Sequence, residues 1–182
     1  MGTTKTRNIL IDVARELFAT QGVESTTIGD IAVASNKGRR TIYTYFKNKE
    51  DILISLFEEK MGVFVEKLQQ IIKDENSASE KLGQMIENHF RVLANDRHLA
   101  TVTQLELRQS NKEIRLKINA ILKEYLKMID QIIIEGMLSG EFDPSMDVRI
   151  ARQMVFGTID EISTTWVMNE YRYDLMNLAP KV

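Results

Sequence analysis

The scarcity of helix-breaking residues constrains the fold of this 182-residue chain more than any other feature. It contains two prolines, Pro144 and Pro180, so long stretches contain none. Proline interrupts a helix because its ring removes an N–H donor and clashes with the preceding turn. Apolar residues recur at helical spacing through these stretches, as in the steps between Ile114, Ile118 and Ile121. No segment alternates polar and apolar residues as a strand would. The pattern predicts an all-α chain of about nine helices.

The charged residues divide the chain into two parts of opposite sign. Residues 1–49 hold eight Lys or Arg against four Asp or Glu, a net charge of +4. The whole chain carries −2, so residues 50–182 carry −6. A basic module attracts polyanions, and a change of sign along a chain indicates modules with different partners. We therefore expect a basic N-terminal domain at 1–49 and a second domain with another role at 50–182.

The composition excludes several classes of site. The chain has no cysteine, which rules out disulfides, thiolate metal sites and Cys nucleophiles. Its two histidines, His89 and His98, are too few for a metal site, and we expect both on helix surfaces or helix ends. No nucleophile elbow or glycine-rich phosphate loop is present. We therefore predict no catalytic residue, no metal and no cofactor.

The chain also lacks the sequence features of a membrane protein. No apolar run reaches the roughly 20 residues that a membrane-spanning helix needs. The first residues contain no apolar signal-peptide core. We expect a cytoplasmic protein without a membrane partner.

Residues 26–46 have the pattern of two short helices joined by a tight turn. Thr26 or Thr27 can cap the first helix, and Asn36 tolerates the left-handed conformation that a turn requires. Gly38 can open the second helix. Two such helices form a helix-turn-helix, whose second helix enters the major groove of DNA. Arginines suit guanine edges, whereas hydroxyl groups and lysines suit phosphates. The pattern favours DNA binding over an ordinary surface hairpin.

Several motifs in and around this segment form a recognisable set. They are Gly22, Thr26-Thr27, Ile31-Ala32, Thr41-Ile42-Tyr43, Tyr45-Phe46 and Asn48-Lys49-Glu50-Asp51-Ile52-Leu53. On these motifs the chain resembles the TetR family of bacterial repressors. The resemblance implies a three-helix N-terminal DNA-binding domain and a C-terminal helical bundle for ligand binding and dimerisation. It implies DNA contacts from Thr26, Thr27, Arg39, Arg40, Thr41, Tyr43, Tyr45 and Lys49, and the basic turn before the second helix adds Lys37 and Gly38 as candidates.

The contacts implied by the resemblance differ in kind. Thr26 or Thr27 would present backbone N–H groups to a phosphate, and Arg39 and Arg40 would reach bases. The remaining contacts, to phosphate or sugar, would come from Thr41, Tyr43, Tyr45 and Lys49. The turn departs from the common family sequence, because Lys37 replaces an apolar residue and Arg40 replaces a glycine. Two additional basic side chains should steepen the salt dependence of DNA binding.

Large or flexible apolar side chains are frequent in residues 50–182. Read singly, each is an ordinary core residue. As a set, they could line an apolar cavity between helices, where bundles usually bind ligands, and Met suits a flexible ligand. The candidate ligand-binding residues are Met61, Phe64, Met85, Phe90, Leu105, Arg108, Met128, Met154 and Trp166.

A narrower resemblance concerns three segments of this second domain. Residues 46–57, 102–111 and 147–168 resemble the FadR-type regulators of fatty-acid degradation within the TetR family. This resemblance implies a long-chain acyl-CoA as the effector, with its tail in the bundle and its CoA end near the mouth. Candidates for the CoA phosphates are Arg91, Arg97, Arg108, Arg149 and Arg152.

A homodimer is expected from the size of the DNA-binding module, because one half-site gives little affinity and dimers bind two. The last long helix carries small residues beside large apolar ones, which suits a two-fold helix–helix contact. The candidate interface residues are Ala151, Met154, Gly157, Thr158, Ile162 and Trp166. The family usually has one more dimer helix, so we expect the helix after residue 177 to be short or missing.

Three alternatives remain open at this point. The first is a TetR-type regulator of an efflux pump, with an aromatic and acidic drug pocket formed by Trp166, Tyr171, Tyr173, Glu161 and Glu106. The second is an α-helical enzyme acting on lipid thioesters. The third is a DNA-organising protein without an effector, for which the bundle should be filled and lack a cavity.

Overall fold

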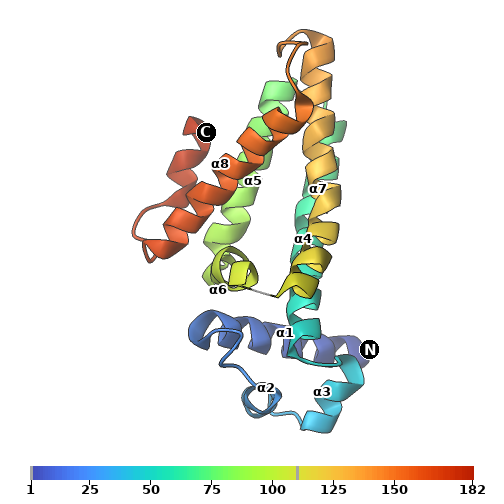
Figure 1. Ribbon diagram of the computed structural model, residues 1–182, viewed down its shortest axis with the longest axis vertical. Helices are drawn as coiled ribbons and strands as arrows, with labels where there is room; N and C mark the ends of the chain where they lie inside the picture. The colour runs from blue at the N-terminus through green and yellow to red at the C-terminus, as the bar shows by residue number, and fades with distance from the viewer. Residues whose placement is uncertain (1, 110) are drawn as a thin grey trace.

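The computed structural model describes residues 2–109 and 111–182; Ser110, within one of the segments that carry the FadR resemblance, lies outside the described residues. The described residues are mostly helical and contain no strand, which confirms the all-α prediction. The α-helices are α1 (Gly2–Gln21), α2 (Ile28–Ser35), α3 (Arg39–Tyr45), α4 (Lys49–Lys73), α5 (Ala78–Asn95), α6 (Arg97–Thr101), α7 (Lys112–Ser139) and α8 (Val148–Met168). Shorter helical segments are the π-helix η1 (Val102–Glu106) and the 3-10 helices η2 (Leu107–Gln109) and η3 (Leu175–Lys181). Figure 1 shows α1–α3 at one end of an elongated bundle.

The predicted helix-turn-helix is formed by α2 and α3. Thr27 caps α2 in a capping box, since its hydroxyl accepts the Asp30 N–H and the Asp30 carboxylate accepts the Thr27 N–H. Asn36 ends α2 with a φ of 52°, the left-handed conformation expected of it. The two helices pack on α1 through a shared core of Leu10, Ala14, Phe18, Ile31, Ile42 and Phe46.

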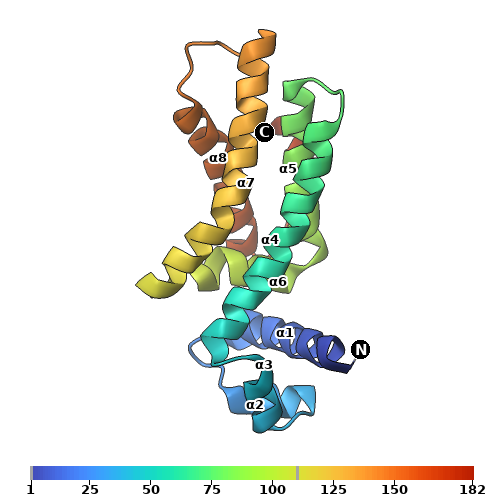
Figure 2. The same cartoon turned by 90° about the vertical axis from the view of Figure 1, so that its right-hand side faces the viewer.

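Helix α4 connects the DNA-binding end to the bundle. It begins at Lys49, where the Asn48 side chain accepts the Asp51 N–H, and continues without a break for 25 residues. Near its start α4 packs against α1, and further along it packs against α7 (Figure 2). The predicted domain boundary at residue 49 therefore coincides with the start of a helix that belongs to both parts.

The end of the bundle far from α1–α3 is closed by a corner between α7 and α5. Gly140 ends α7 with a φ of 81°, the left-handed C-cap conformation that glycine adopts without strain. The Glu141 carboxylate then accepts the N–H groups of Ala78 and Ser79 at the start of α5. These two bonds are the first causes of the lowered pKa of Glu141. The corner holds α5 and α7 together at this end.

Helix α8 ends at Met168, where its last turn leads into a chain reversal. Glu170 and Tyr171 have positive φ values of 55° and 59°, which reverse the chain direction. Trp166 is buried in this reversal, and its Nε1 donates to the Tyr173 carbonyl at 2.8 Å. The chain then forms η3, which packs on α5 and contains Pro180.

Candidate functional site: DNA-reading surface and ligand cavity

Helix α3 presents a polar face to solvent. Ile42 is fully buried and points into the core, while Arg40, Tyr43 and Thr44 are exposed on the opposite side. Tyr43 is 57% exposed, unusually high for an aromatic residue without a partner. Arginine and tyrosine exposed on one short helix at the tip of the molecule suit contact with a polyanion.

Two adjacent arginines at the start of α3 have different surroundings. The Arg39 guanidinium lies against the first turn of α2, where a Cβ on Gly29 would stand 2.7 Å from its Nη2. The pKa of Asp30 is lowered mainly by the backbone and side-chain hydrogen bonds of Thr27, with a smaller contribution from Arg39. Arg40 extends into solvent. In the free protein, Arg40 is thus the more available of the two for a base.

Thr26 and Lys49 hold the turn between α1 and α2 closed. The Lys49 ammonium donates to the carbonyl oxygens of Val23 at 2.7 Å and of Glu24 and Thr26 at 3.1 Å. Thr26 is fully buried, its hydroxyl donates to Gly22 O and its N–H to Val23 O. The family resemblance implied that both residues contact DNA phosphates. The structure gives these groups partners inside the protein, so a phosphate contact would require them to exchange partners.

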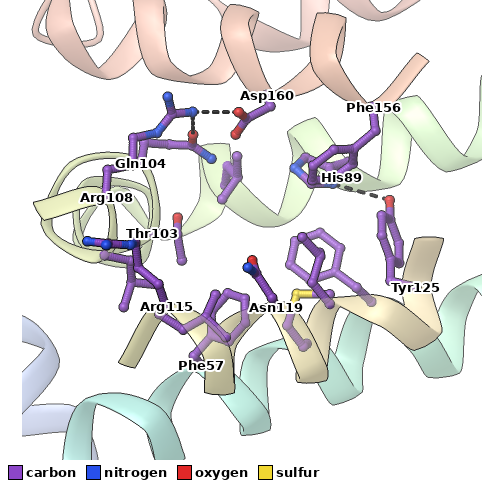
Figure 3. A pocket seen from close by; sticks show the side chains of 16 residues that line it. Phe57, His89, Thr103, Gln104, Arg108, Arg115, Asn119, Tyr125, Phe156 and Asp160 are labelled. Carbon is purple, nitrogen blue, oxygen red and sulfur yellow. Dashed lines mark hydrogen bonds and ion pairs between the residues drawn. The ribbon is translucent and has the colours of Figure 1, made fainter. Parts of the chain in front are cut away.

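A cavity of about 290 Å³ lies within the bundle, between α4, α5, the η1–η2 segment, α7 and α8 (Figure 3). Most of its wall is apolar. The lining residues are Phe57, Met61, Phe64, His89, Leu93, Thr103, Gln104, Leu107, Arg108, Arg115, Ile118, Asn119, Leu122, Tyr125, Phe156 and Asp160. The presence of this cavity argues against the filled bundle expected of a purely DNA-organising protein.

The end of the cavity nearer to α1–α3 is charged. Arg108 donates from Nη2 to the Asp160 carboxylate at 2.5 Å and to Thr164 Oγ1 at 2.9 Å. Arg115, at the start of α7, lines the same end together with Gln104 (Figure 3). Two guanidinium groups at one end of an apolar cavity can bind phosphate or carboxylate groups of an amphiphilic ligand.

The opposite end of the cavity is lined by aromatic rings and a buried histidine. His89 Nδ1 shares a hydrogen bond of 3.3 Å with the Tyr125 hydroxyl. Burial lowers the pKa of His89 to about 4 and raises that of Tyr125, so both are neutral at pH 7. The prediction that His89 lies on a helix surface is wrong. Its spacing from Met85 and Leu93, on the apolar face of α5, was the signal that could have revealed it.

Three of the nine predicted ligand-binding residues line this cavity, namely Met61, Phe64 and Arg108. The other six do not line it. Four belong to the packed core or its edge: Met85, Phe90, Leu105 and Met128. Trp166 is buried in the reversal after α8, and Met154 is 68% exposed on the outer face of α8. Helical periodicity identified the apolar face of each helix. It did not identify which residues of that face line the cavity and which pack in the core.

Of the predicted phosphate-binding arginines, Arg108 alone lines the cavity. Arg91 pairs with Glu87 on its own helix. Arg97 stacks over the Tyr171 ring at 5.0 Å from its centroid. Arg152 donates to Asp130 at 2.7 Å, and Arg149 is exposed near the start of α8. Arg115 does line the cavity and was missed because the periodicity of α7 marks only its apolar residues, such as Ile114 and Ile118, and not the polar side chain beside them that turns to the cavity.

The residues suggested for an aromatic and acidic drug pocket do not form one. Trp166 packs against Tyr171, with ring centroids 4.8 Å apart, in the reversal after α8. The Glu106 carboxylate accepts the Val23 N–H at 2.8 Å. None of the suggested residues lines the cavity described above, Tyr173 and Glu161 included.

The predicted dimer residues divide between two faces of α8. Met154 and Thr158 are exposed, together with Ile150 and Met168, which were not predicted. Gly157 and Ile162 are partly exposed, whereas Ala151 and Trp166 are buried within the chain. The outer face of α8 thus carries an uncovered apolar stripe, and the dimer itself stays a prediction.

The described part of the chain contains neither a metal-binding cluster nor a membrane-spanning helix. Residues 2–109 and 111–182 contain no cluster of three or more His, Asp or Glu that could hold a metal ion. None of the helices described is both long enough and apolar enough to cross a membrane.

A helix-turn-helix and an internal cavity in one chain are the features of a one-component transcription regulator. Residues 10–56 match the family described as "Bacterial regulatory proteins, tetR family", and residues 57–182 match "YsiA-like protein, C-terminal region". The chain belongs to the TetR family of transcriptional regulators, as its N-terminal motifs indicated.

Three relatives are informative about this chain. It is 55% identical over 173 residues to the fatty acid metabolism regulator protein of Bacillus subtilis (strain 168), covering 95% of this chain and 89% of the relative. The crystal structure of Bacillus subtilis FadR in complex with stearoyl-CoA is 54% identical, with a TM-score of 0.92 and coverages of 95% and 93%. The fatty acid degradation regulator FadR from Bacillus halodurans is 47% identical, with a TM-score of 0.94 and coverages of 97% and 91%.

Proposed function

We propose that this protein is a dimeric TetR-family repressor of fatty-acid metabolism genes, released from operator DNA by a long-chain fatty acyl-CoA. The observation that carries the proposal is the cavity, which is apolar along most of its wall and bears Arg108 and Arg115 at one end. A long-chain acyl-CoA has the matching distribution, with an apolar tail and a phosphorylated head. The similar Bacillus subtilis structure with stearoyl-CoA supports this ligand class.

The η1 segment offers a physical link between ligand and DNA. Thr103 and Gln104 line the cavity, and Glu106, at the end of the same segment, accepts the Val23 N–H in the turn before α2. A ligand that displaces the cavity wall would therefore move the support of the DNA-binding domain. Acyl-CoA must bind more tightly to the conformation with the lower DNA affinity, because only differential affinity shifts a population.

The remaining parts of the proposal follow from the same function. Two copies of the chain would place their α3 helices in successive major grooves, about 34–36 Å apart. The protein would act in the cytoplasm, where its DNA lies, and would bind and release acyl-CoA without turning it over. No cofactor besides the effector is needed for this role.

The test is a gel-shift titration. An operator is first selected from random duplex DNA with the purified protein, and stearoyl-CoA, CoA and stearate are then added to the complex. We expect saturating stearoyl-CoA to dissociate the complex and CoA alone to leave it intact. A complex that persists at saturating concentrations of several long-chain acyl-CoAs would contradict the proposal, and a turnover of the thioester would favour the enzyme alternative.

A further inference from the structure

The far end of the cavity is formed by four rings that contact one another. The Phe64 ring lies 4.8 Å from the His89 ring and 6.0 Å from the Tyr125 ring, measured between centroids. The Tyr125 and Phe156 rings are 6.2 Å apart in an edge-to-face arrangement. Each ring comes from a different helix, in the order α4, α5, α7 and α8. We refer to these residues as the four-ring wall.

The four-ring wall lies at the opposite end of the cavity from the two arginines. Arg115 and Tyr125 are ten positions apart on α7, which corresponds to about 15 Å along the helix axis. Figure 3 shows Arg108 and Arg115 on one side, with His89, Tyr125 and Phe156 on the other. A ligand held by its charged head at the arginines would direct its apolar tail toward the rings.

Between α4, α5 and α7 the bundle is filled beyond the four-ring wall. A second hollow, between α5, α8 and η3, shares no lining residue with the cavity. Leu68, Met85 and Ile129 lie about one turn further along α4, α5 and α7, are buried, and do not line the cavity. A chain that reaches the rings therefore has no free space ahead of it between α4, α5 and α7. Close-packed cores resist the insertion of additional methylene groups.

The wall is also held in place by a polar contact. The hydrogen bond between His89 and Tyr125 joins α5 to α7 across the end of the cavity. A buried hydrogen bond is costly to break, because both groups would lose their partner away from water. The wall is therefore stiffer than an aliphatic one, whose side chains could change rotamers.

We propose that the four-ring wall sets the longest acyl chain that the protein accepts, with Phe64 and Phe156 as the residues that determine chain length. This inference rests on the proposed function. Up to the length at which the terminal methyl group meets the rings, each added CH₂ should raise the affinity roughly fourfold. Beyond that length the affinity should stop rising or should fall.

The experiment measures the affinity of the full chain for saturated acyl-CoAs from octanoyl-CoA to docosanoyl-CoA by calorimetry. Phe64→Leu and Phe156→Leu remove part of the wall and should move the break in the affinity series to longer chains. Leu122→Phe adds a ring one turn before Tyr125 and should move the break to shorter chains. Ile132→Ala, buried on α7 outside the cavity, is the control and should leave the break in place.

The outcomes separate this inference from the function on which it rests. One outcome would contradict the inference while leaving the proposed function intact. The wild-type protein would bind long-chain acyl-CoA, but each of the three cavity variants would change the affinity by the same factor at every chain length. The four-ring wall would then not limit the length of the acyl chain. If the wild-type protein binds no acyl-CoA of any length, the proposed effector itself is wrong. A break that moves in opposite directions in Phe64→Leu and Leu122→Phe supports the inference.

Discussion

His89 shows how one buried side chain can affect both the cavity and the stability of the protein. It lines the cavity, contacts the Phe64 ring and shares its hydrogen bond with Tyr125. No charged partner compensates its burial, and the loss of hydration lowers its pKa. A neutral imidazole is thus part of the wall, and protonation would place an uncompensated charge inside it.

Stability should depend on pH through His89. Because its pKa falls from 6.5 to about 4 on folding, the unfolded chain binds this proton at higher pH than the folded protein does. The contribution of neutral His89 to the free energy of unfolding is therefore fully present above pH 6.5. It is lost as the pH falls from 6.5 toward 4, and the total loss is about 3 kcal/mol. Urea unfolding of wild type and His89→Phe at intervals between pH 7 and 4 measures this difference.

Tyr125→Phe is the matched control for that measurement. It breaks the same hydrogen bond but retains the imidazole, so it should lower the free energy of unfolding by about 1 kcal/mol at pH 7 and keep the pH dependence. Equal pH dependence in wild type and His89→Phe would show that the burial of His89 does not control it.

At the scale of elements, η1 contacts both halves of the protein. Its Thr103 and Gln104 line the cavity, while Glu106 accepts the Val23 N–H. Just before it, Asp96 accepts a 2.9 Å hydrogen bond from Arg15 of α1. A π-helix has one additional residue per turn and often marks a functional position. Together with α4, which lines the cavity and packs on α1, this short element is where a change in the cavity would reach the DNA-binding domain.

Glu106→Ala should weaken the communication between ligand and DNA. We expect acyl-CoA affinity to remain within about threefold of wild type, because Glu106 does not line the cavity. The ratio of operator affinities without and with acyl-CoA should decrease by roughly tenfold, the loss of about 1.4 kcal/mol of coupling. Fluorescence anisotropy of labelled operator measures the operator affinity without and with acyl-CoA, and the acyl-CoA concentration that halves operator binding reports the acyl-CoA affinity. Glu124→Ala, exposed on α7, is the control, and an unchanged ratio in Glu106→Ala would exclude this role.

Much of the organisation into helices could be predicted from the sequence, because caps and periodicity are local. The capping residue Thr27 and the left-handed Asn36 both occur where the pattern placed them. The end of α8 was less predictable. The reversal at Glu170 and Tyr171 is held by a long-range contact, since the Tyr171 hydroxyl donates to the Arg97 carbonyl at 3.1 Å.

At the scale of the whole molecule, the uncovered apolar stripe on α8 is the surface through which we expect two copies of the chain to form a dimer. Ile150, Met154 and Met168 are between 58% and 69% exposed on the outer face of this helix. A dimer that covers the stripe would place the two DNA-reading ends on one side when its two-fold axis runs along the bundle.

Met154→Asp should disrupt the proposed dimer. A charge in the centre of an apolar contact must lose its hydration, so we expect the dimer dissociation constant to rise at least tenfold, with a parallel loss of operator affinity. Sedimentation equilibrium measures the first and gel shift the second. Val63→Asp, a comparable exposed apolar position on α4, is the control. A Met154→Asp protein that remains dimeric would place the interface elsewhere.

The family, the all-helical class and the charged DNA-reading helix were evident from the sequence, because each rests on residues that are neighbours along the chain. The cavity was different. It depends on which apolar side chains from five segments meet at one level of the bundle, and Phe57, His89 and Phe156 line it while Met85 and Met128 do not. Periodicity defines the buried face of each helix. The rotation and height at which the helices pack are set by long-range contacts, and they decide where that face meets space for a ligand.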